Sequence, residues 1–447
     1  MISYQGNRMI IEKPTCSCTH HRMPDTNLYI GSGIIEHAVE YIKTHLNKTH
    51  CMLVTDGNLN GLFGEKVREI LSKGYDVTLC IPPSEGELKP DNEALGYIMM
   101  EYTPGIDFMV ALGSGTVNDL TRYAAHLLRI PFVSIGTAPS MDGYVSVISP
   151  MLKGNLKINK PADYPAVGIY DLDILSTAPK DMLFAGFGDV IGKYVAKADW
   201  ILSSYVTGEH LCPYCIGLSD EAIGLVISSL DEIAAGSKKG SQALLEALLL
   251  TGLAMLINTD SRPAASNEHN MGHFWEMQKL RENKPHPSHG EAVGIATLYC
   301  LAFYEKILSV DINAVDTHSL PLGNYDPLTR ESRLLSVYGP VVGRSVIDDN
   351  TDEPIAAEER LRRVGNFISG FGKIKEALSF LPDYREILDM YRKLEGPMSA
   401  DSIGIDRNLL RDSLLYAKDY RSRYNVFKTA EELGILDGTV DGILDIL

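Results

Sequence analysis

Three histidines in the second half of the chain have the type and spacing of metal ligands or acid/base groups. His269 and His273 lie four residues apart in SNEHNMGHFWEM, and His289 follows in HPSHGEAV. Residues four apart on a helix share one face, so the first two would point the same way. Surface or buried polar roles would also fit, and the spacing by itself does not decide between these alternatives.

Asp189, in AGFGDVIGK, could complete a metal site with two of these histidines. One carboxylate and two imidazoles suit Zn²⁺, Fe²⁺ or Ni²⁺, and three protein ligands leave positions open for a substrate oxygen. The alternative role of Asp189 is that of a helix cap.

The elements that position these residues change character along the chain. The first 175 residues alternate short β-rich runs with helical patterns, which predicts a Rossmann-like, mostly parallel sheet covered by helices. The expected strands are 51–56, 76–82, 108–115, 131–137 and 166–171. Beyond them, helical periodicity replaces the strand pattern. We therefore predict a nucleotide-binding α/β domain over residues 1–175 and an all-α, metal- and substrate-binding domain over residues 176–447.

One region of the second half departs from helical periodicity. Residues 310–355 are rich in Pro, Gly and Asp, residues that interrupt helices. We expect an irregular segment between helices there.

Polar and small residues follow three of the expected strands. Asp56 ends the first, GSGTVND (113–119) follows another, and SIGTAPSMDGYVS (134–146) runs out of the next. A glycine turn that leads into a helix lets a ligand approach the backbone, and the helix N-terminus attracts a phosphate. Asp56 could bind an adenosine ribose and disfavour a 2′-phosphate, or be a solvated loop residue. Together these strand ends predict a nucleotide site.

The composition is that of a soluble globular protein. The 447 residues are 45% apolar and 22% charged, and the length favours two domains. A formal charge of −17 argues against nucleic acid or an anionic membrane surface as a partner. The longest uncharged apolar run, 247–257, is shorter than the ~20 residues that cross a bilayer, and no apolar signal core begins the chain. We expect a cytoplasmic protein with no membrane partner.

Seven cysteines, an odd number in a long chain without an export signal, favour thiols over a disulfide framework. TCSCTHHR brings together Cys16, Cys18, His20 and His21, which could be half of a zinc site. No matching pair follows at finger-like spacing, so a strand or loop is the alternative. CPYC (212–215) has redox spacing but lacks the strand-to-helix setting of a redox motif.

Five motifs together resemble one superfamily. GSGTVND, TAPSMDGYVS, GFGDVIGK, EHNMGHFWEM and HPSHGEAVGI occur in the order and approximate spacing of the superfamily of metal-dependent glycerol dehydrogenases, iron-type alcohol dehydrogenases and dehydroquinate synthases. Within it, the chain looks most like the bacterial branch of the sn-glycerol-1-phosphate dehydrogenases. The resemblance covers about residues 25–305 by motif and implies a dehydroquinate synthase-like architecture.

This resemblance implies roles for individual residues. It implies that Asp189, His269 and His289 bind the metal, and that Asp142 and His273 face the substrate as catalytic residues beside Asp189. It also implies a dinucleotide site, whose residues are Asp56, Gly115, Thr116, Val117, Asn118, Asp119, Thr137, Ala138, Pro139, Ser140 and Ser146. Lys193 and Arg262 are the cations nearest these motifs that could bind a substrate phosphate.

The activity that the resemblance implies is the reversible reduction of dihydroxyacetone phosphate, a small phosphorylated three-carbon substrate, to sn-glycerol 1-phosphate. The expected cofactors are NAD, with NADP weaker, and one divalent zinc, nickel or iron ion. We also expect a homo-oligomer. The alternatives are glycerol dehydrogenase or another polyol dehydrogenase, and a dehydroquinate synthase-like cyclase, whose pattern has glutamate where this chain has Asp189. A binding protein without chemistry is the non-enzymatic alternative.

Overall fold

The computed structural model describes most of the chain, namely residues 2–19, 21–153, 156–315, 320 and 326–447. By contacts the chain divides into two compact units: Met1–Val190 with Gly217–Asp260, and Ile191–Ile216 with Ser261–Leu447. The division falls inside helices α7 (Lys180–Ile191) and α9 (Pro213–Ser228), so each of these helices continues across it.

This division groups residues differently from the predicted single boundary after residue 175. Helix α11 (Lys238–Asn258) belongs to the first unit because it packs against α6 (Leu172–Leu175) and the 3-10 helix η3 (Asp142–Val145). Sequence periodicity reports the type of an element and not its packing partners, so it did not separate α11 from the other helices.

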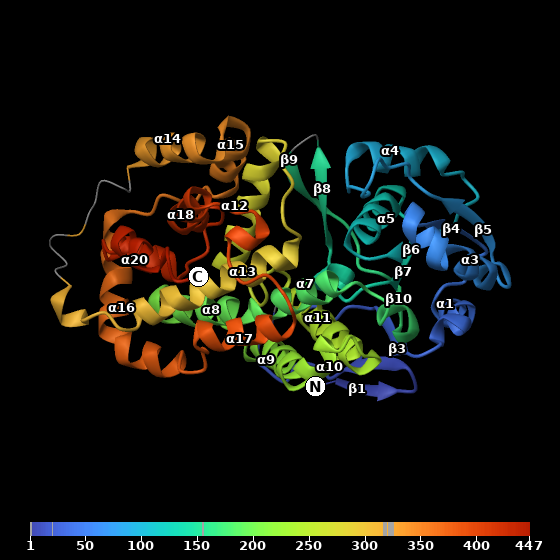
Figure 1. The fold of residues 1–447 in the computed structure, drawn as a ribbon, viewed down its shortest axis with the longest axis horizontal. Helices are drawn as coiled ribbons and strands as arrows, with labels where there is room; N and C mark the ends of the chain where they lie inside the picture. Colours follow the sequence, from blue (N-terminus) through green and yellow to red (C-terminus); the bar gives the residue numbers. More distant parts are fainter. Residues whose placement is uncertain (1, 20, 154–155, 316–319, 321–325) are drawn as a thin grey trace. The chain divides into compact units, whose positions relative to one another are not determined.

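The first unit is built on an eight-stranded, mostly parallel sheet (Figure 1), as predicted. Its strand order is β1-β2-β3-β10-β7-β6-β4-β5. The strands are β1 (Ile2–Gln5), β2 (Arg8–Ile11), β3 (Asn27–Gly31), β4 (His50–Val54), β5 (Asp76–Cys80), β6 (Phe108–Gly113), β7 (Phe132–Gly136) and β10 (Val167–Asp171). The neighbouring pairs from β3 to β5 are parallel, whereas β1 and β2 form an antiparallel edge. All five predicted strands are present.

Alternate residues of the central strands pack on opposite faces of this sheet. Leu53 and Val110 belong to the core under α1 (Ala38–His45) and α3 (Glu65–Ser72). Met52 and Met109 belong to the core under α4 (Asn92–Glu101) and α5 (Gly115–Leu128). A sheet that is buried on both faces needs continuous apolar strands, and this is why β4 and β6 read as unbroken apolar runs.

Smaller elements complete the first unit. They are η1 (Ile34–His37), α2 (Gly57–Leu59), the π-helix η2 (Asn60–Gly64), α10 (Leu230–Ala234) and a separate antiparallel hairpin of β8 (Ile148–Lys153) and β9 (Leu156–Pro161). Helix α11 is long and apolar enough to cross a membrane, but 83% of its apolar window is buried inside the structure. This burial is typical of the core helix of a globular unit.

The second unit is helical throughout its described residues. Its helices are α8 (Lys193–Val206), α12 (Asn267–Arg281), α13 (His289–Ile307), η4 (Ile312–Ala314), α14 (Pro327–Tyr338), α15 (Pro340–Asp349), α16 (Ala357–Ala377), α17 (Tyr384–Lys393), η6 (Asp401–Ile403), α18 (Arg407–Tyr416), η7 (Ala417–Asp419), α19 (Val426–Glu432) and α20 (Leu436–Ile443). The prediction of an all-α second half is thus confirmed for the described residues after Asp171.

Helices α14 and α15 correct the expectation of an irregular segment over residues 310–355. Pro327 and Pro340 are the first residues of these helices, where the missing N–H of proline has no helical partner to lose. The prolines therefore start helices here instead of breaking them. Residues 316–319 and 321–325 of the same segment lie outside the described residues.

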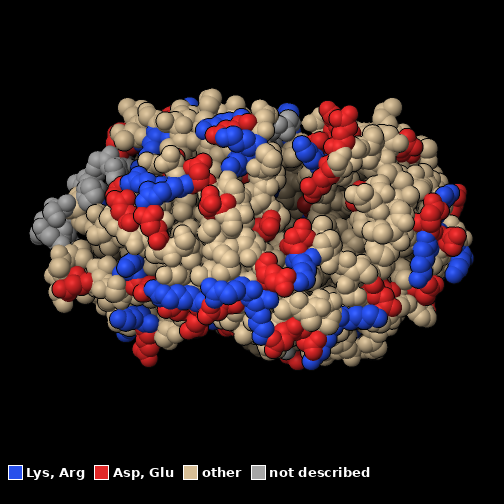
Figure 2. All heavy atoms as spheres, in the orientation of Figure 1, with Lys and Arg blue, Asp and Glu red and all other residues tan. Residues whose placement is uncertain are grey.

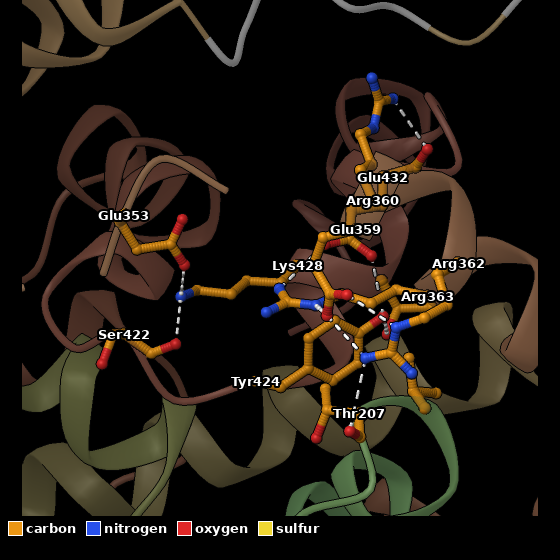
Figure 3. Close-up of polar contacts among 12 residues, drawn as sticks. Thr207, Glu353, Glu359, Arg360, Arg362, Arg363, Ser422, Tyr424, Lys428 and Glu432 are labelled. Carbon is orange, nitrogen blue, oxygen red and sulfur yellow. Dashed lines mark hydrogen bonds and ion pairs between the residues drawn. The ribbon is translucent and has the colours of Figure 1, made fainter. Parts of the chain in front are cut away.

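Charged side chains are buried together where α16 packs against α19 (Figure 3). Glu432, which is 3% exposed, lies 3.4 Å from Arg363 and accepts a hydrogen bond from the Tyr424 hydroxyl at 3.2 Å. Arg360 is fully buried and donates to the Glu432 carbonyl at 2.9 Å. Lys428 pairs with a carboxylate from outside these helices, at 2.8 Å. Every charge drawn there has a polar partner, as a buried ionic group requires.

Charges on the surface are mixed. On the face drawn in Figure 2, lysine and arginine side chains lie next to aspartate and glutamate side chains and do not gather into one basic area.

Candidate active site

The carboxyl ends of β4 and β6 lie side by side where the order of the sheet reverses. The two strands pair in parallel, but the chain leaves β4 for β5 on one side and leaves β6 for β7 on the other. Open α/β sheets bind nucleotides at such a switch point, outside the carboxyl ends of the strands. Asp56 follows β4 by two residues and Ser114 follows β6 directly, so both lie at this edge.

Helix α5 presents its N-terminus at the same edge. It begins at Gly115, and Ser114 makes no capping hydrogen bond with its side chain. The first N–H groups of a helix have no partner within it, and the helix dipole favours an anion there. A Cβ on Gly115 would meet only Met141, at 3.7 Å, so a ligand could approach this backbone closely. A Cβ on Gly113 would come within 2.5 Å of Val117, so that glycine serves packing.

Three of the predicted cofactor residues turn their side chains into the protein. Val117 and Asn118 are buried, and Asn118 accepts a hydrogen bond from the Ser134 hydroxyl at 2.8 Å. Asp119 pairs with Arg122 at 3.1 Å, and burial raises the pKa of Asp119 to about 6 although the arginine lowers it. Within residues 115–119, the groups that could contact a dinucleotide are therefore Gly115, Thr116 and the backbone N–H groups.

Asp56 caps the short helix α2, a role that was not predicted from the sequence. Its Oδ1 accepts a hydrogen bond from the N–H of Leu59 at 2.9 Å, at the start of α2. The side chain is half-buried. The cap uses one carboxylate oxygen, and Oδ2 is left to meet a ribose hydroxyl.

Arg122, which sequence analysis missed, holds the loop that follows β7. It lies on α5, is fully buried, and donates to the carbonyl oxygens of Gly143, Tyr144 and Ile148. The loop contains the predicted cofactor residues Thr137, Ala138, Pro139 and Ser140, of which the first three are buried. An arginine in an amphipathic helix normally reads as a surface residue, so no signal in the sequence marks this one.

The predicted cofactor residue Ser146 closes a local turn. Its hydroxyl donates to the carbonyl of Ile148 at 3.0 Å and accepts from the N–H of the same residue at 2.9 Å. These contacts give Ser146 a structural role in the loop, and its role toward a cofactor stays a prediction.

Asp189, His269 and His289 each offer one ligand atom, and these atoms all lie within 4.8 Å of one another. Asp189 is fully buried in the last turn of α7, His269 is in the first turn of α12, and His289 is the first residue of α13. Ser288 and Glu291 form a capping box that fixes the start of α13 at His289. Metal binding by this group stays a prediction, and its donors fit zinc, iron or nickel.

Glu268 orients His269. Its Oε1 lies 2.7 Å from Nδ1 of His269 and also accepts the N–H of Ser266 at 2.9 Å. Glu268 is fully buried. A carboxylate at Nδ1 favours the tautomer whose Nε2 is open to a metal ion, a common arrangement behind metal-binding histidines. Glu268 was not predicted from the sequence, although a carboxylate beside a candidate ligand is a usable signal.

His273 lies one turn further along α12. Its ring is 5.4 Å from the ring of His289 and 5.5 Å from that of Tyr420, centroid to centroid. Its Nδ1 lies 3.7 Å from a carboxylate oxygen of Glu276. The prediction that His269 and His273 share one helix is confirmed, and the latter is near the proposed ligands without belonging to their group.

Asp142, the predicted substrate-side carboxylate, begins η3 and is held through its backbone. Its N–H donates to Oδ2 of Asp189 at 3.0 Å. Helix α11 approaches so closely that a Cβ on Gly252 would lie 2.5 Å from the Asp142 carbonyl oxygen. Helix α7 approaches the same loop, since a Cβ on Gly186 would lie 2.0 Å from the Pro139 carbonyl oxygen. Two helices thus pin the loop by close backbone contact.

Arg262 and Lys193, the cations proposed from sequence for a substrate phosphate, are buried in the second unit. Arg262 is committed to Glu209 through two hydrogen bonds of 3.1 and 2.9 Å and to two backbone carbonyls. These hydrogen bonds hold Arg262 inside the second unit, and its guanidinium N–H groups are already directed at protein acceptors. The expectation of a phosphate contact at Arg262 is therefore not supported.

Arg421 and Arg423 are better placed cations that sequence analysis missed. Both donate to the hydroxyl of Ser261, at 3.1 and 3.0 Å. Both are half-buried, and they flank the turn that follows Tyr420, the residue beside His273. Two guanidinium groups that converge on one neutral hydroxyl form a local positive site. The spacing RSR was the available signal.

Comparison with known proteins places the chain in an enzyme class. Residues 29–179 match the family model described as iron-containing alcohol dehydrogenase. The structure resembles that of an iron-containing alcohol dehydrogenase from Corynebacterium glutamicum, with a TM-score of 0.62 and 14% identity over 95% of this chain and 97% of the other. The fold is thus that of the iron-type alcohol dehydrogenases.

Two curated relatives specify the family. The chain is 35% identical to glycerol-1-phosphate dehydrogenase [NAD(P)+] of Halalkalibacterium halodurans over 72% of this chain and 82% of that protein. It is 29% identical to the enzyme of the same name from Geobacillus stearothermophilus over 92% and 93% of the two chains. The chain belongs to the family of the NAD(P)-dependent glycerol-1-phosphate dehydrogenases.

Proposed function

We propose that this chain reduces dihydroxyacetone phosphate to sn-glycerol 1-phosphate with NADH and catalyses the reverse oxidation. The observation that carries the proposal is the grouping of Asp189, His269 and His289 within 4.8 Å, in a chain of this family. The reduction adds a hydride to C2 of the ketone and a proton to its oxygen, so the site must bind a reductant and deliver a proton.

The metal would be held by Asp189, His269 and His289. A divalent ion in such a site supplies Lewis acidity that polarises a carbonyl oxygen. Glu268 supports this role, because its hydrogen bond at Nδ1 sets which nitrogen of His269 faces the ion. Zinc, nickel and iron all accept one carboxylate with two imidazoles, so the ion present would follow availability.

The dinucleotide would bind at the edge formed by Asp56 and the N-terminus of α5. Bound NADH supplies the hydride. The N–H groups at Gly115 and Thr116 would donate hydrogen bonds to the pyrophosphate, and Oδ2 of Asp56 would accept one from a ribose hydroxyl. A 2′-phosphate would meet the negative charge of Asp56, so we expect NADH to be preferred over NADPH.

His273 and Asp142 would handle the proton. Asp142 is fixed through its backbone N–H, and His273 lies one turn from a proposed ligand on the same helix. In the direction of reduction, one of the two side chains donates the proton that C2 oxygen gains. In the direction of oxidation, it removes that proton.

The substrate phosphate would bind Arg421 and Arg423. A guanidinium recognises phosphate through paired N–H donors, and the Ser261 hydroxyl that both contact now could be replaced by a phosphate oxygen. Loss of one such contact costs about 10- to 100-fold in kcat/KM, the equivalent of a hydrogen bond to a charged group. Arg421→Ala should therefore lower kcat/KM for dihydroxyacetone phosphate and leave kcat/KM for dihydroxyacetone unchanged. Arg344→Ala, an exposed arginine of the same unit, is the control.

The decisive experiment is chiral analysis of the product formed from dihydroxyacetone phosphate and NADH. We expect sn-glycerol 1-phosphate. The enantiomer, glycerol 3-phosphate, would overturn the proposal. Faster turnover of dihydroxyacetone than of its phosphate would assign a glycerol dehydrogenase, and ring closure of a seven-carbon phosphate would assign a cyclase. A homo-oligomeric, cytoplasmic enzyme without nucleic-acid or membrane partners stays a prediction from the sequence.

A further inference from the structure

A second group of metal-ligating side chains shares no residue with the candidate active site. Cys16, Cys18, His21 and Cys212 each offer one ligand atom, and these atoms all lie within 4.8 Å of one another. His20, which the sequence placed with them, lies outside the described residues. We propose that the four residues bind one Zn²⁺ ion as a structural site.

The separation between Cys16 and His21 fits a shared tetrahedral ion. Zinc binds sulfur at about 2.3 Å and nitrogen at about 2.0–2.1 Å, so at a tetrahedral angle the two ligand atoms lie about 3.6 Å apart. Sγ of Cys16 lies 3.6 Å from Nδ1 of His21 and 4.0 Å from Nε2. The nearer nitrogen is therefore the ligand atom of His21. A thiol–imidazole hydrogen bond has a similar length, so metal content must separate the two explanations.

Three of the four proposed ligands, Cys16, Cys18 and His21, lie in a segment whose described residues form no regular structure. Between β2 and β3, the described residues of 12–26 form neither helix nor strand. Irregular segments of more than about 12–15 residues are uncommon in compact proteins unless something other than backbone ladders holds them. The segment gains a backbone contact at Arg22, whose N–H donates to the carbonyl of Ile257 at 3.3 Å. A metal ion at residues 16–21 would fix the part before this contact.

Cys212 lies at the start of a helix, where its position is fixed. It is fully buried and directly precedes Pro213, the first residue of the 16-residue helix α9. The backbone N–H of Cys215 donates to Sγ of Cys212 at 3.4 Å. This hydrogen bond orients the sulfur that Cys212 contributes to the group.

The donor set indicates a structural and not a catalytic ion. Three thiolates and one imidazole complete the tetrahedral shell of zinc, so no position is left for a substrate or water. Soft thiolates select zinc over the magnesium or calcium that carboxylates would favour. Cys215 is not a member of the group, so the CPYC motif contributes one ligand to it.

The test measures zinc in the purified full-length enzyme. We expect the organomercurial p-hydroxymercuribenzoate, which displaces zinc from thiolates, to release one equivalent per chain to a metallochromic dye. Protein reconstituted with Co²⁺ should show thiolate-to-cobalt absorption. Cys18→Ser should lose that absorption and one equivalent of metal. Asp189→Asn with His289→Ala should keep both, because those residues are in the other group.

Cys215→Ser is the matched control, since its backbone N–H to Cys212 is unchanged, and it should keep the metal. Three results would each overturn the proposal. They are wild-type enzyme that releases no zinc to the organomercurial, Cys18→Ser that keeps the full zinc content, and a disulfide among Cys16, Cys18 and Cys212 in protein purified under reducing conditions. The wild-type measurement needs no variant to fold, so a poorly folding Cys18→Ser leaves the test intact.

Discussion

The backbone N–H of Asp142 donates a hydrogen bond to Oδ2 of Asp189 at 3.0 Å. This bond joins the loop after β7 to the last turn of α7, and it uses a backbone donor, so it does not depend on the side chain of Asp142. A hydrogen bond at one oxygen limits the rotation of the Asp189 carboxylate. The same bond places the predicted proton-handling residue beside a predicted ligand, so substitutions at the two positions should not be additive.

Replacement of Glu268 by Gln should weaken metal binding without removing a ligand. The amide no longer carries the charge that sets the tautomer of His269, and loss of such a partner typically costs about 10- to 100-fold in metal affinity. Competition with a chelator measures the affinity. Glu282→Gln, at the exposed end of the same helix, is the control. Equal affinity of Glu268→Gln and wild type would show that Glu268 does not orient the ligand.

His273→Ala and His289→Ala should fail in different ways. His289→Ala should lose both the active-site metal and activity, because it removes a proposed ligand. His273→Ala should keep the metal and lose about 10²- to 10⁴-fold in kcat, the usual contribution of general acid–base catalysis. Metal analysis and steady-state kinetics on both variants decide this. A His273→Ala enzyme without metal would reverse the assignment.

Gly252→Ala should lower kcat clearly while it lowers the thermal unfolding temperature only a little. A Cβ at this position would lie 2.5 Å from the Asp142 carbonyl oxygen, so the loop that carries Asp142 must move. Gly224→Ala is the matched control, since it lies on a helix of the same unit with nothing within 4 Å of the new Cβ. That change should be neutral or stabilise by up to about 1 kcal/mol. Thermal unfolding and kcat are the measurements, and full activity of Gly252→Ala would contradict the close approach.

Asp56→Ser should shift cofactor choice without loss of the helix cap. Serine can accept the Leu59 N–H as aspartate does, but it lacks the charge that repels a 2′-phosphate. We expect wild type to prefer NADH over NADPH by at least ~10-fold in kcat/KM, and the variant to lose NADH efficiency while it gains NADPH efficiency. Asp56→Ala, which loses cap and charge, separates the two effects. Equal use of both cofactors by wild type would rule out a ribose contact at Asp56.

Glu432 should make the enzyme less stable as pH rises. Burial raises the pKa of Glu432 to about 7, although Arg363 lowers it. A carboxyl with a raised pKa binds its proton more tightly in the folded state, so its contribution is complete at low pH. That contribution is lost as pH rises from about 4.5 to about 7.

Glu432→Gln should therefore flatten the fall in unfolding free energy across this pH range, by at most about 3 kcal/mol. Denaturant unfolding at the two ends of the range measures the difference. Glu376→Gln, an exposed residue on α16, should leave the pH dependence unchanged. If the free energy of unfolding depended on pH in the same way for Glu432→Gln and wild type, Glu432 would not be the cause of the pH dependence.

The central strands were predictable because each is a short, unbroken apolar run, as burial on two faces requires. The hairpin of β8 and β9 was not, because its strands carry lysines and prolines and it lies outside the main sheet. Helices α14 and α15 were missed because proline and glycine at helix starts resemble helix breakers. Sequence patterns predict an element reliably when its residues are buried at regular intervals. They predict it poorly when residues typical of helix ends, such as Pro and Gly, make up much of the segment.

The candidate site was predictable where ligand types recur at helical spacing, as with His269 and His273. It was not predictable where the function of a residue depends on distant packing. Arg262 and Arg421 are both arginines near motifs, yet the first is a buried anchor and the second faces a hydroxyl at 3.1 Å. Cys212 shows the same limit, because only the folded chain brings it to Cys16.

Gly186 and Gly252 face the loop of Pro139 and Asp142 from two different helices, each at a distance that excludes even a methyl group. The conformation of this loop thus depends on the absence of side chains at these two glycine positions. In a saturation-mutagenesis map, both positions should reject every other amino acid to a similar degree, since the first side-chain carbon already collides. A tolerance profile that ignores size, charge and polarity would distinguish them from positions that contact a ligand, where chemically similar replacements survive.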